Sequence, residues 1–367
     1  MTPSTEKFQS PLLYSVLSIA TGFFAAFTAG LPSYALAAGI SDDQPVMMSV
    51  YVDNDLFTGN NKDEDYTGGI AVTFSGADAS KHPFSIDRPL SWINQSTGIH
   101  RLIGSNETPL ELTLHSCEVG LAAFTPTDIE NRQPVLDDRP YSSLIYLSNT
   151  QQSIADDRNS ALITSFTVGV LGLPIAGEIQ NAIHSVIGSN QAEGWDHQIS
   201  EGGEPTVKYS ATYQQYLDTG IENLQATTSA GISLGYLTEA SLGFSVRTGV
   251  IRTPRWSFNV HNSNYGEKSN ITAPTTSALD EFYVLAGANI KARAYNALLQ
   301  GQFRDSDVSY SANEVEPLVY EGWIGLGCEF KSGIRLNYVV RHQSSELKTG
   351  LADRSFTYAE FTASYKY

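Results

Sequence analysis

The main pattern along this chain is a short alternation of apolar and polar residues that recurs many times. In the last such segment, Phe361, Ala363 and Tyr365 fall on one side, while Thr362 and Ser364 fall on the other. A period of two is typical of β-strands. Strands with an apolar side toward lipid and a polar side toward a lumen are the pattern of a membrane barrel.

Twelve segments of this kind occur, and an even number suits an up-and-down barrel. We therefore predict an all-β fold, an antiparallel transmembrane β-barrel of about twelve strands. The expected strands are Val46–Phe57, Tyr66–Ser75, Glu111–Phe124, Tyr141–Ser148, Ala161–Leu171, Thr206–Tyr216, Gln225–Leu237, Leu242–Ile251, Glu281–Ala292, Tyr320–Phe330, Ile334–His342 and Phe356–Tyr367.

The connections between the expected strands fall into two kinds. Lys331–Gly333 and Thr238–Ser241 predict tight turns. Short turns at one end and long loops at the other end are typical of outer-membrane barrels. The long polar loops expected here are Thr58–Asp65, Gly76–Pro109, Thr127–Pro140, Pro174–Pro205, Thr253–Asp280 and the region around Asp305–Glu316.

One stretch of the chain, 174–198, has helical instead of strand periodicity. Gln180 and His184 are four residues apart and would share one face of a helix. Pro174 before this run and Gly188 after it suit a helix start and stop. The helix either plugs or covers the barrel, with His184 solvated, or His184 takes part in chemistry. The apolar stripe of this amphipathic helix would be formed by Ile179, Ile183, Val186 and Ile187.

The charge composition limits the classes of partner that the chain can bind. The chain has 39 acidic and 22 basic side chains and a formal net charge of −17. This balance argues against a nucleic-acid partner, because a polyanion needs a basic surface. The two cysteines, Cys117 and Cys328, lie on strands that would not be neighbours, so we expect free thiols. Their spacing matches no metal motif.

The first 37 residues read as an export signal. Leu12–Leu36 is mostly apolar and small, Lys7 precedes it, and Ala35-Leu36-Ala37 has the A-x-A form of a cleavage site. A transmembrane anchor is the alternative interpretation. We expect residues 1–37 to be a signal peptide and residues 38–367 to form one outer-membrane barrel domain.

Polar clusters stand at several expected strand ends. Asp53-Asn54-Asp55 ends the first strand, Asp63–Gly69 leads into the second, and Asp137–Tyr141 leads into the fourth. Functional residues are often carried on such loops. The acidic loop could equally be a solvated turn. For Asp138 and Arg139, a structural ion pair inside the barrel wall is favoured over catalysis.

Short motifs follow one another along nearly the whole mature chain, and their order is more specific than any one of them. This ordered set is similar to the outer-membrane lipid A deacylase family, which removes the 3′-acyloxyacyl group of lipid A. The motifs are Asn54-Asp55, Tyr66-Thr67-x-Gly69, Phe124-Thr125-Pro126, Asp138-Arg139-Pro140-Tyr141, Gly172-x-Pro174, Gln180-Asn181-x-x-His184, Trp195-x-x-Gln198 and Ser345-Glu346-Leu347-x-Thr349-Gly350.

The resemblance implies a twelve-stranded barrel in the cell outer membrane, with an α-helix in an extracellular loop beside the active site. The barrel-assembly machinery would insert it, and the terminal strand ending on Tyr367 is similar to the segment that this machinery reads. The substrate implied is lipid A of lipopolysaccharide in the outer leaflet.

The resemblance also implies roles for particular residues of a calcium-dependent esterase. His184 would be the general base acting on a water, and Gln180 would help to hold that water or the substrate. Asn54, Asp55 and Thr67 would form the opposite wall, with Asp55 as a calcium ligand. A hard cation can stabilise the oxyanion of ester hydrolysis, and a neutral imidazole can deprotonate water.

Arg132 matches a basic residue of the family that would meet a lipid A phosphate. Two positions differ from the family pattern. Asn190 stands six residues after the histidine, where an acidic residue is usual, and Asn131 stands where a lysine is usual. If a carboxylate is needed near His184, then Glu193, Glu201 or Glu204 would have to supply it. His197, beside Trp195, is expected to be packed or solvated and not to act as the base.

Two other functions fit a barrel of this kind. An outer-membrane phospholipase A would need a Ser-His pair facing lipid, and no G-x-S-x-G run is present. A structural barrel or a pore would need no catalytic residues at all.

Overall fold

The structure is a computed structural model that describes residues 46–58, 65–103, 112–257, 259, 268 and 280–366. The expected signal peptide at 1–37, the Asp63-Glu64 part of the acidic cluster and Tyr367 lie outside the described residues.

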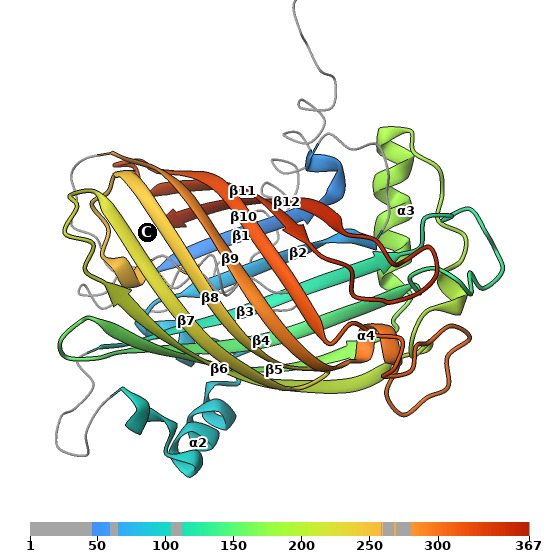
Figure 1. The fold of residues 1–367 in the computed structure, drawn as a ribbon, viewed down its shortest axis with the longest axis horizontal. Coiled ribbons are helices and arrows are strands. Elements are labelled where there is room, and N and C mark those ends of the chain that lie inside the picture. The colour runs from blue at the N-terminus through green and yellow to red at the C-terminus, as the bar shows by residue number, and fades with distance from the viewer. Residues whose placement is uncertain are drawn as a thin grey trace, which may run out of the picture.

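Twelve antiparallel strands form a closed barrel, with each strand paired to its neighbours in the chain and β1 paired to β12 (Figure 1). The predicted fold class and each predicted strand are confirmed. The strands are β1 (Met47–Asn54), β2 (Asp65–Ser75), β3 (Leu112–Thr125), β4 (Ser142–Ile154), β5 (Ser160–Leu171), β6 (Glu204–Leu217), β7 (Leu224–Gly235), β8 (Leu237–Val250), β9 (Glu281–Asn296), β10 (Leu318–Glu329), β11 (Ile334–Gln343) and β12 (Phe356–Lys366).

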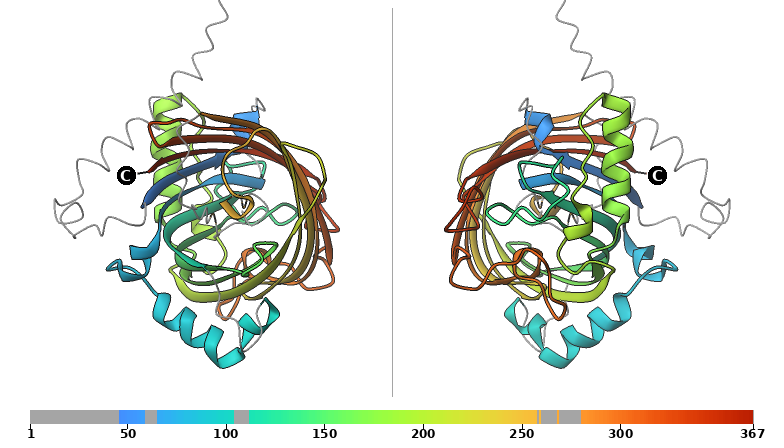
Figure 2. Two further views of the ribbon diagram at one scale, coloured as in Figure 1. Left: turned by 90° about the vertical axis from the view of Figure 1, so that its left-hand side faces the viewer. Right: turned by 90° about the vertical axis from the view of Figure 1, so that its right-hand side faces the viewer.

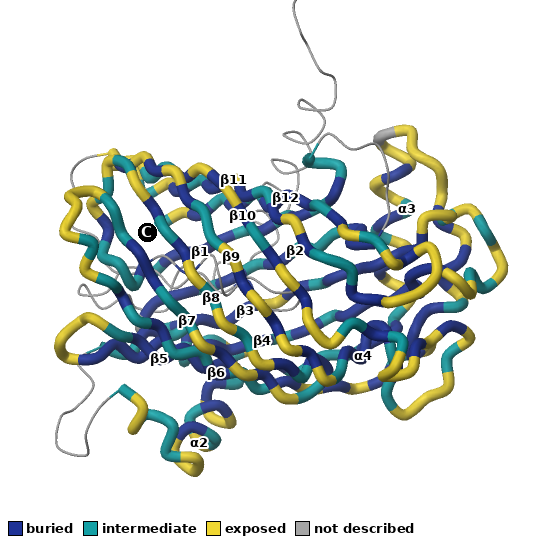
Figure 3. The backbone as a smooth tube through the Cα atoms, in the orientation of Figure 1, coloured by how far each residue is buried: buried dark blue, intermediate teal, exposed yellow. Residues whose placement is uncertain are grey.

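Buried and exposed residues alternate along the strands (Figure 3). In β10, Ile324 and Leu326 are exposed, whereas Trp323 is buried. In β12, Thr362 and Ser364 are buried on the side that faces the lumen. The barrel therefore has a polar lumen and an apolar outer surface, as predicted. No helix among the described residues is both long and apolar enough to cross a membrane.

The helices lie at both ends of the barrel. Because the number of strands is even, β1 begins and β12 ends at the same rim of the barrel, the rim of the termini. At the opposite rim are α3 (Ile175–Ile187) and the short α4 (Ala297–Gln300), whereas α2 (Asp87–Thr97) lies outside the barrel near the rim of the termini (Figures 1 and 2). The part of the chain that the structure describes contains the 3-10 helices η1 (Asp55–Thr58), η2 (Ala77–Lys81), η3 (Ile99–Leu102), η4 (Trp195–His197) and η5 (Arg255–Ser257).

The expectation that long loops occupy one end and short turns the other is wrong. Connections after even-numbered strands share the rim of the termini, and two of these, β2–β3 and β8–β9, are long. The turn predicted at Thr238–Ser241 is also wrong, because these residues pair with β9 within β8, and the chain reverses at Tyr236. The β2–β3 connection, predicted to be a polar loop, contains α2.

Two described residues of the β8–β9 connection, Asn259 and Lys268, contact side chains of the barrel lumen. The side-chain amide of Asn259 donates to Gln152 at 3.3 Å, and the main-chain N–H of Lys268 donates to Glu118 at 2.8 Å. The ammonium of Lys268 bonds Asp53 and lies 3.7 Å from Glu360. A buried carboxylate requires a nearby cation or hydrogen-bond donors, and this connection supplies both.

Removing the Lys268 cation should weaken the barrel. Lys268→Met keeps an apolar side chain but leaves Asp53 and Glu360 without this ammonium. Loss of one partner of a buried ion pair costs about 3–5 kcal/mol. We expect a lower temperature for conversion from the folded to the unfolded band on a heat-modifiability gel. Lys331→Met, on the exposed β10–β11 turn, is the control, and equal temperatures for both variants would contradict the prediction.

Candidate functional site

The helix α3 has the predicted ends, and its polar pair lies on its buried face. It begins after Pro174 and ends at Gly188, which has a left-handed φ of 77°. Gln180 and His184 are only 6% and 4% exposed, whereas Val186 is 73% exposed. The polar pair is therefore on the buried face, and the apolar side of the helix is turned away from the protein.

Small residues let α3 approach the barrel closely. Ala176 packs in one cluster with Ala123 of β3 and with Trp195. A Cβ atom added to Gly177 would lie 2.6 Å from the Trp195 indole, so only glycine fits there. The ring of Trp195 also lies 4.9 Å from the ring of Tyr141, centroid to centroid. These contacts fix the buried face of α3 against the wall.

Two hydrogen bonds orient the polar pair. The indole N–H of Trp195 donates to Oε1 of Gln180 at 2.8 Å. Nδ1 of His184 bonds the main-chain carbonyl of Asn190. Because a carbonyl only accepts, Nδ1 carries the proton and the lone pair of the neutral ring is on Nε2.

The carboxylates considered as replacements for an acid at position 190 have other contacts. Glu193 bonds the guanidinium of Arg132. Glu204 accepts from the hydroxyl of Ser200 at 2.5 Å and from the main-chain N–H of Phe303 at 2.7 Å. Glu201 is exposed. Nδ1 of the His184 ring is thus held by a main-chain carbonyl, and Glu193 and Glu204 are engaged elsewhere.

The second group of predicted residues lies where β1 and β2 end. The side-chain amide of Asn54 donates to the main-chain carbonyl of Thr67, and the Thr67 hydroxyl bonds that of Thr125 at 2.7 Å. Asp55 follows as the first, buried residue of η1. At Gly68 a β-bulge shifts the register, and a Cβ atom there would lie 2.5 Å from the Asp53 carbonyl.

Strand β3 connects the two groups. Ala122 and Phe124 pack in the lumen cluster, so Ala123 and Thr125 face outward, since alternate strand residues share a face. Ala123 contacts α3, and Thr125 bonds Thr67. In Figures 1 and 2, α3 and the short blue helix η1 lie at the same end and on the same side of the barrel. The predicted residues therefore lie on the outer wall.

The loop that carries Arg132 is tied to two other loops. Nε2 of His197 donates to the Arg132 carbonyl at 3.0 Å, and Nδ1 donates to the Asp307 carboxylate. This contact with Asp307 raises the pKa of His197. Since both ring nitrogens donate, His197 is an imidazolium in this arrangement and does not suit the role of a base. The Arg132 guanidinium is exposed, and its contact lowers the pKa of Glu193.

Asp138 and Arg139 have structural contacts, as favoured from the sequence, but with other partners. Arg139 pairs with Glu346 at 2.6 Å, and Asp138 pairs with Arg354 at 2.9 Å. Arg354 also pairs with Asp65 at 2.7 Å. These ion pairs join the β3–β4 and β11–β12 connections and the start of β2 at the rim near α3.

The described residues contain no cluster of three or more His, Cys, Asp and Glu side chains suited to a metal ion. At the end of β1, Asp55 follows Asn54, whose side chain bonds the main chain of Thr67, so neutral oxygens accompany one carboxylate in this region. One carboxylate with neutral oxygens is a donor set that fits calcium, which also accepts carbonyl oxygens and water as ligands. Cys117 and Cys328 are free, as expected.

A closed barrel with a polar lumen, an apolar exterior and a helix-covered polar site on its outer wall defines a class, the outer-membrane β-barrel proteins. Within this class, a model of the family described as Outer membrane protein LpxR matches residues 19–367, and the chain belongs to that family. The protein is located in the outer membrane.

A solved structure agrees with this fold. LpxR from Salmonella typhimurium has 18% sequence identity and a TM-score of 0.65, covering 87% of this chain and 99% of that chain. A KdgM porin has 6% identity and a TM-score of 0.37, covering 88% and 99% of the two chains. A comparison with curated proteins finds no match.

Gly177→Ala should disturb the candidate site without removing any of its polar groups. The added methyl group would meet the Trp195 indole, so we expect Trp195 to move and its bond to Gln180 to be lost. A shift of tryptophan emission to longer wavelength would report this. The matched control is Glu178→Ala, at an exposed position of the same helix. Identical spectra for Gly177→Ala and the unaltered protein would contradict the argument.

Proposed function

We propose that this protein is an outer-membrane esterase that hydrolyses the 3′-acyloxyacyl chain of lipid A in lipopolysaccharide. Membership of the LpxR family implies lipid A modification. The observation that carries the finer proposal is the orientation of α3, whose polar pair faces the outer wall of the barrel while its apolar side is exposed. A lipid of the surrounding leaflet can approach such a site from the side.

The lumen supports this direction of approach. Lys268 of the β8–β9 connection pairs with Asp53 inside it, and Glu321 pairs with Lys291 at 2.7 Å and with Arg341 at 3.1 Å on the lumen side of neighbouring strands. A lumen that holds part of a connection and such ion pairs argues against an open pore. The substrate would therefore remain in the membrane while its ester group approaches the polar pair of α3 from the side.

The proposed reaction begins at His184. Nε2 takes a proton from a water, and the resulting hydroxide attacks the ester carbonyl carbon. The imidazolium then gives the proton to the departing alkoxide, which releases the fatty acid. Because Oε1 of Gln180 already accepts from Trp195, the proposed role of Gln180 toward the water or the substrate is that of a donor through Nε2.

Calcium is the proposed cofactor, and Asp55, Asn54 and Thr67 would hold it. When bound, it would stabilise the negative charge that develops on the carbonyl oxygen. Arg132 is proposed to meet a lipid A phosphate. Its guanidinium bonds Glu193 at the surface, and a phosphate would have to replace this carboxylate.

Variants at His184 and at Asn190 should differ sharply in their rates of fatty-acid release. His184→Ala removes the proposed base, and we expect a loss of about 10²–10⁴ in the rate of fatty-acid release. Asn190→Ala keeps the main-chain carbonyl that holds the ring, so we expect a rate close to that of the unaltered protein. Mass spectrometry of lipid A from membranes that contain each variant measures both. Full activity of His184→Ala would rule out the mechanism.

Calcium dependence gives a separate test. A chelator should stop fatty-acid release, and added Ca²⁺ should restore it. Asp55→Asn removes the one charged ligand proposed, so the Ca²⁺ concentration needed for half-maximal activity should rise by about tenfold or more. Asp78→Asn, on η2 near the other rim, is the control. Activity that is unaffected by chelation would contradict the role of calcium.

A further inference from the structure

A second polar patch lies on the outer wall of the barrel, far along the strands from the candidate site, and α2 covers it. Asn94 is fully buried; its amide group donates to Gln151 at 3.0 Å and Thr164 at 2.8 Å and accepts from Tyr209 at 2.9 Å. Unpaired polar groups are costly in hydrocarbon. These bonds fix α2 as part of the surface that the barrel presents to the membrane.

The opposite side of α2 carries residues of a different kind. Trp92 is 68% exposed, and Arg88, one turn before it, is also exposed. In the following η3, Leu102 is 64% exposed beside the exposed Arg101. Tryptophan and arginine together with exposed apolar side chains are typical of segments that lie at a membrane surface rich in anionic lipid.

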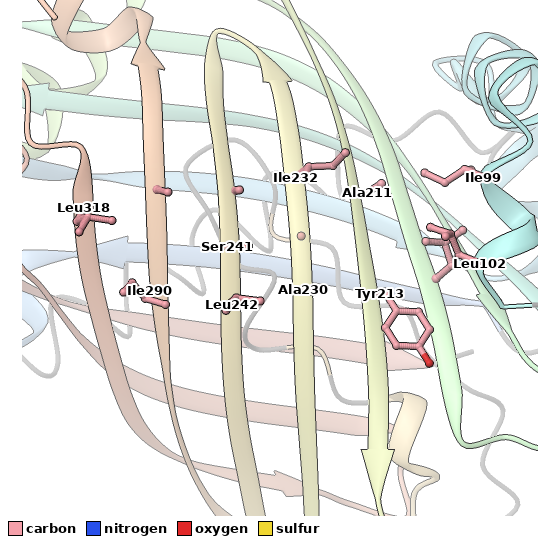
Figure 4. A pocket seen from close by; sticks show the side chains of 14 residues that line it. Ile99, Leu102, Ala211, Tyr213, Ala230, Ile232, Ser241, Leu242, Ile290 and Leu318 are labelled. Atoms are coloured by element: carbon pink, nitrogen blue, oxygen red, sulfur yellow. The ribbon is translucent and has the colours of Figure 1, made fainter.

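Between η3 and the barrel wall runs an apolar groove of about 510 Å³ (Figure 4). Its floor follows a row of paired residues across the strands, in which Tyr213 is opposite Ala230 and Ala230 is opposite Leu242. The small side chain between two larger ones creates the hollow. The residues that carry the argument are Ile99, Leu102, Ala211, Ala230, Ile232 and Leu242.

We propose that α2 and η3 form a binding site for an anionic glycerophospholipid of the leaflet near the chain termini. One acyl chain lies in the groove, Arg101 beside the groove wall binds the phosphate, and Trp92 with Arg88 holds the helix at the membrane surface. The proposal rests on the outer-membrane location and on these contacts. It does not depend on the proposed esterase activity.

Tryptophan quenching in vesicles tests the proposal with the full-length barrel. The probe is phosphatidylglycerol brominated on its acyl chains, diluted into phosphatidylcholine vesicles. Brominated phosphatidylcholine at the same mole fraction is the comparison. Subtracting the emission of Trp92→Phe from that of the unaltered protein isolates Trp92. We expect this component to be quenched at a lower mole fraction of phosphatidylglycerol than of phosphatidylcholine.

Variants then assign the parts of the site. Arg101→Gln should weaken the preference for phosphatidylglycerol about fivefold, the effect of one basic residue near an anionic surface. Leu102→Gln should weaken quenching by both lipids. Lys331→Gln, an exposed basic residue on a turn at the same rim, should change neither. Heat-modifiability gels check that each barrel is folded.

Two outcomes would overturn the proposal. If the Trp92 component is not quenched by either brominated lipid, α2 does not lie against the membrane. If quenching is equal for the two lipids, no anionic lipid is recognised by this segment; a preference left unchanged by Arg101→Gln would instead contradict the role of Arg101 in binding the phosphate.

Discussion

A polar group on the outer wall of a membrane barrel has no water to bond, and this constraint governs both long helices. Asn94 of α2 and Gln180 of α3 each lie on the face turned toward the wall, where hydrogen bonds satisfy them. The opposite faces carry Trp92 and Val186, which are exposed. In a water-soluble protein a surface helix has its apolar side inward. In α3 this arrangement is reversed, since its polar pair is turned inward and an exposed apolar side suits a lipid surrounding.

The interactions in the lumen and those on the outer wall are connected through the strand that carries both. Adjacent strand residues face opposite sides, so Asp53 and Asn54 belong to different environments. Asp53 accepts from the Tyr66 hydroxyl at 2.8 Å and bonds Lys268 inside the barrel, while Asn54 bonds Thr67 outside. The same short piece of β1 thus joins the ion pairs of the lumen to the candidate site. Changes inside the barrel would be felt at the outer wall through this strand end.

Alternation of residues was sufficient to predict the barrel, because it follows directly from the two different environments on either side of each strand. The ends of α3 were also predictable, since Pro174 and Gly188 have strong local preferences. The inward position of Gln180 and His184 was not, because a helical pattern does not show which side meets lipid. The helix α2 was missed among polar residues, although Pro89 in its first turn and Gly98 at its end were usable signals.

Contacts between distant segments could not be derived from spacing alone. The bond from Trp195 to Gln180 joins residues fifteen positions apart, and Lys268 meets Asp53 across 215 positions. The family resemblance identified the candidate residues but not the contacts that they make. It drew attention to the side chain at position 190, whereas the structure uses the carbonyl of that residue.

The carbonyl of Asn190 also bears on how this site can evolve. Every amino acid offers the same main-chain oxygen, so a substitution at this position can be accepted without moving the His184 ring, provided that the loop keeps its path. The orientation of the ring then depends on the backbone conformation of residues 188–194 and not on the side chain of any one of them. Sequence patterns that demand an acid six residues after the histidine would overlook proteins that hold the ring in this way.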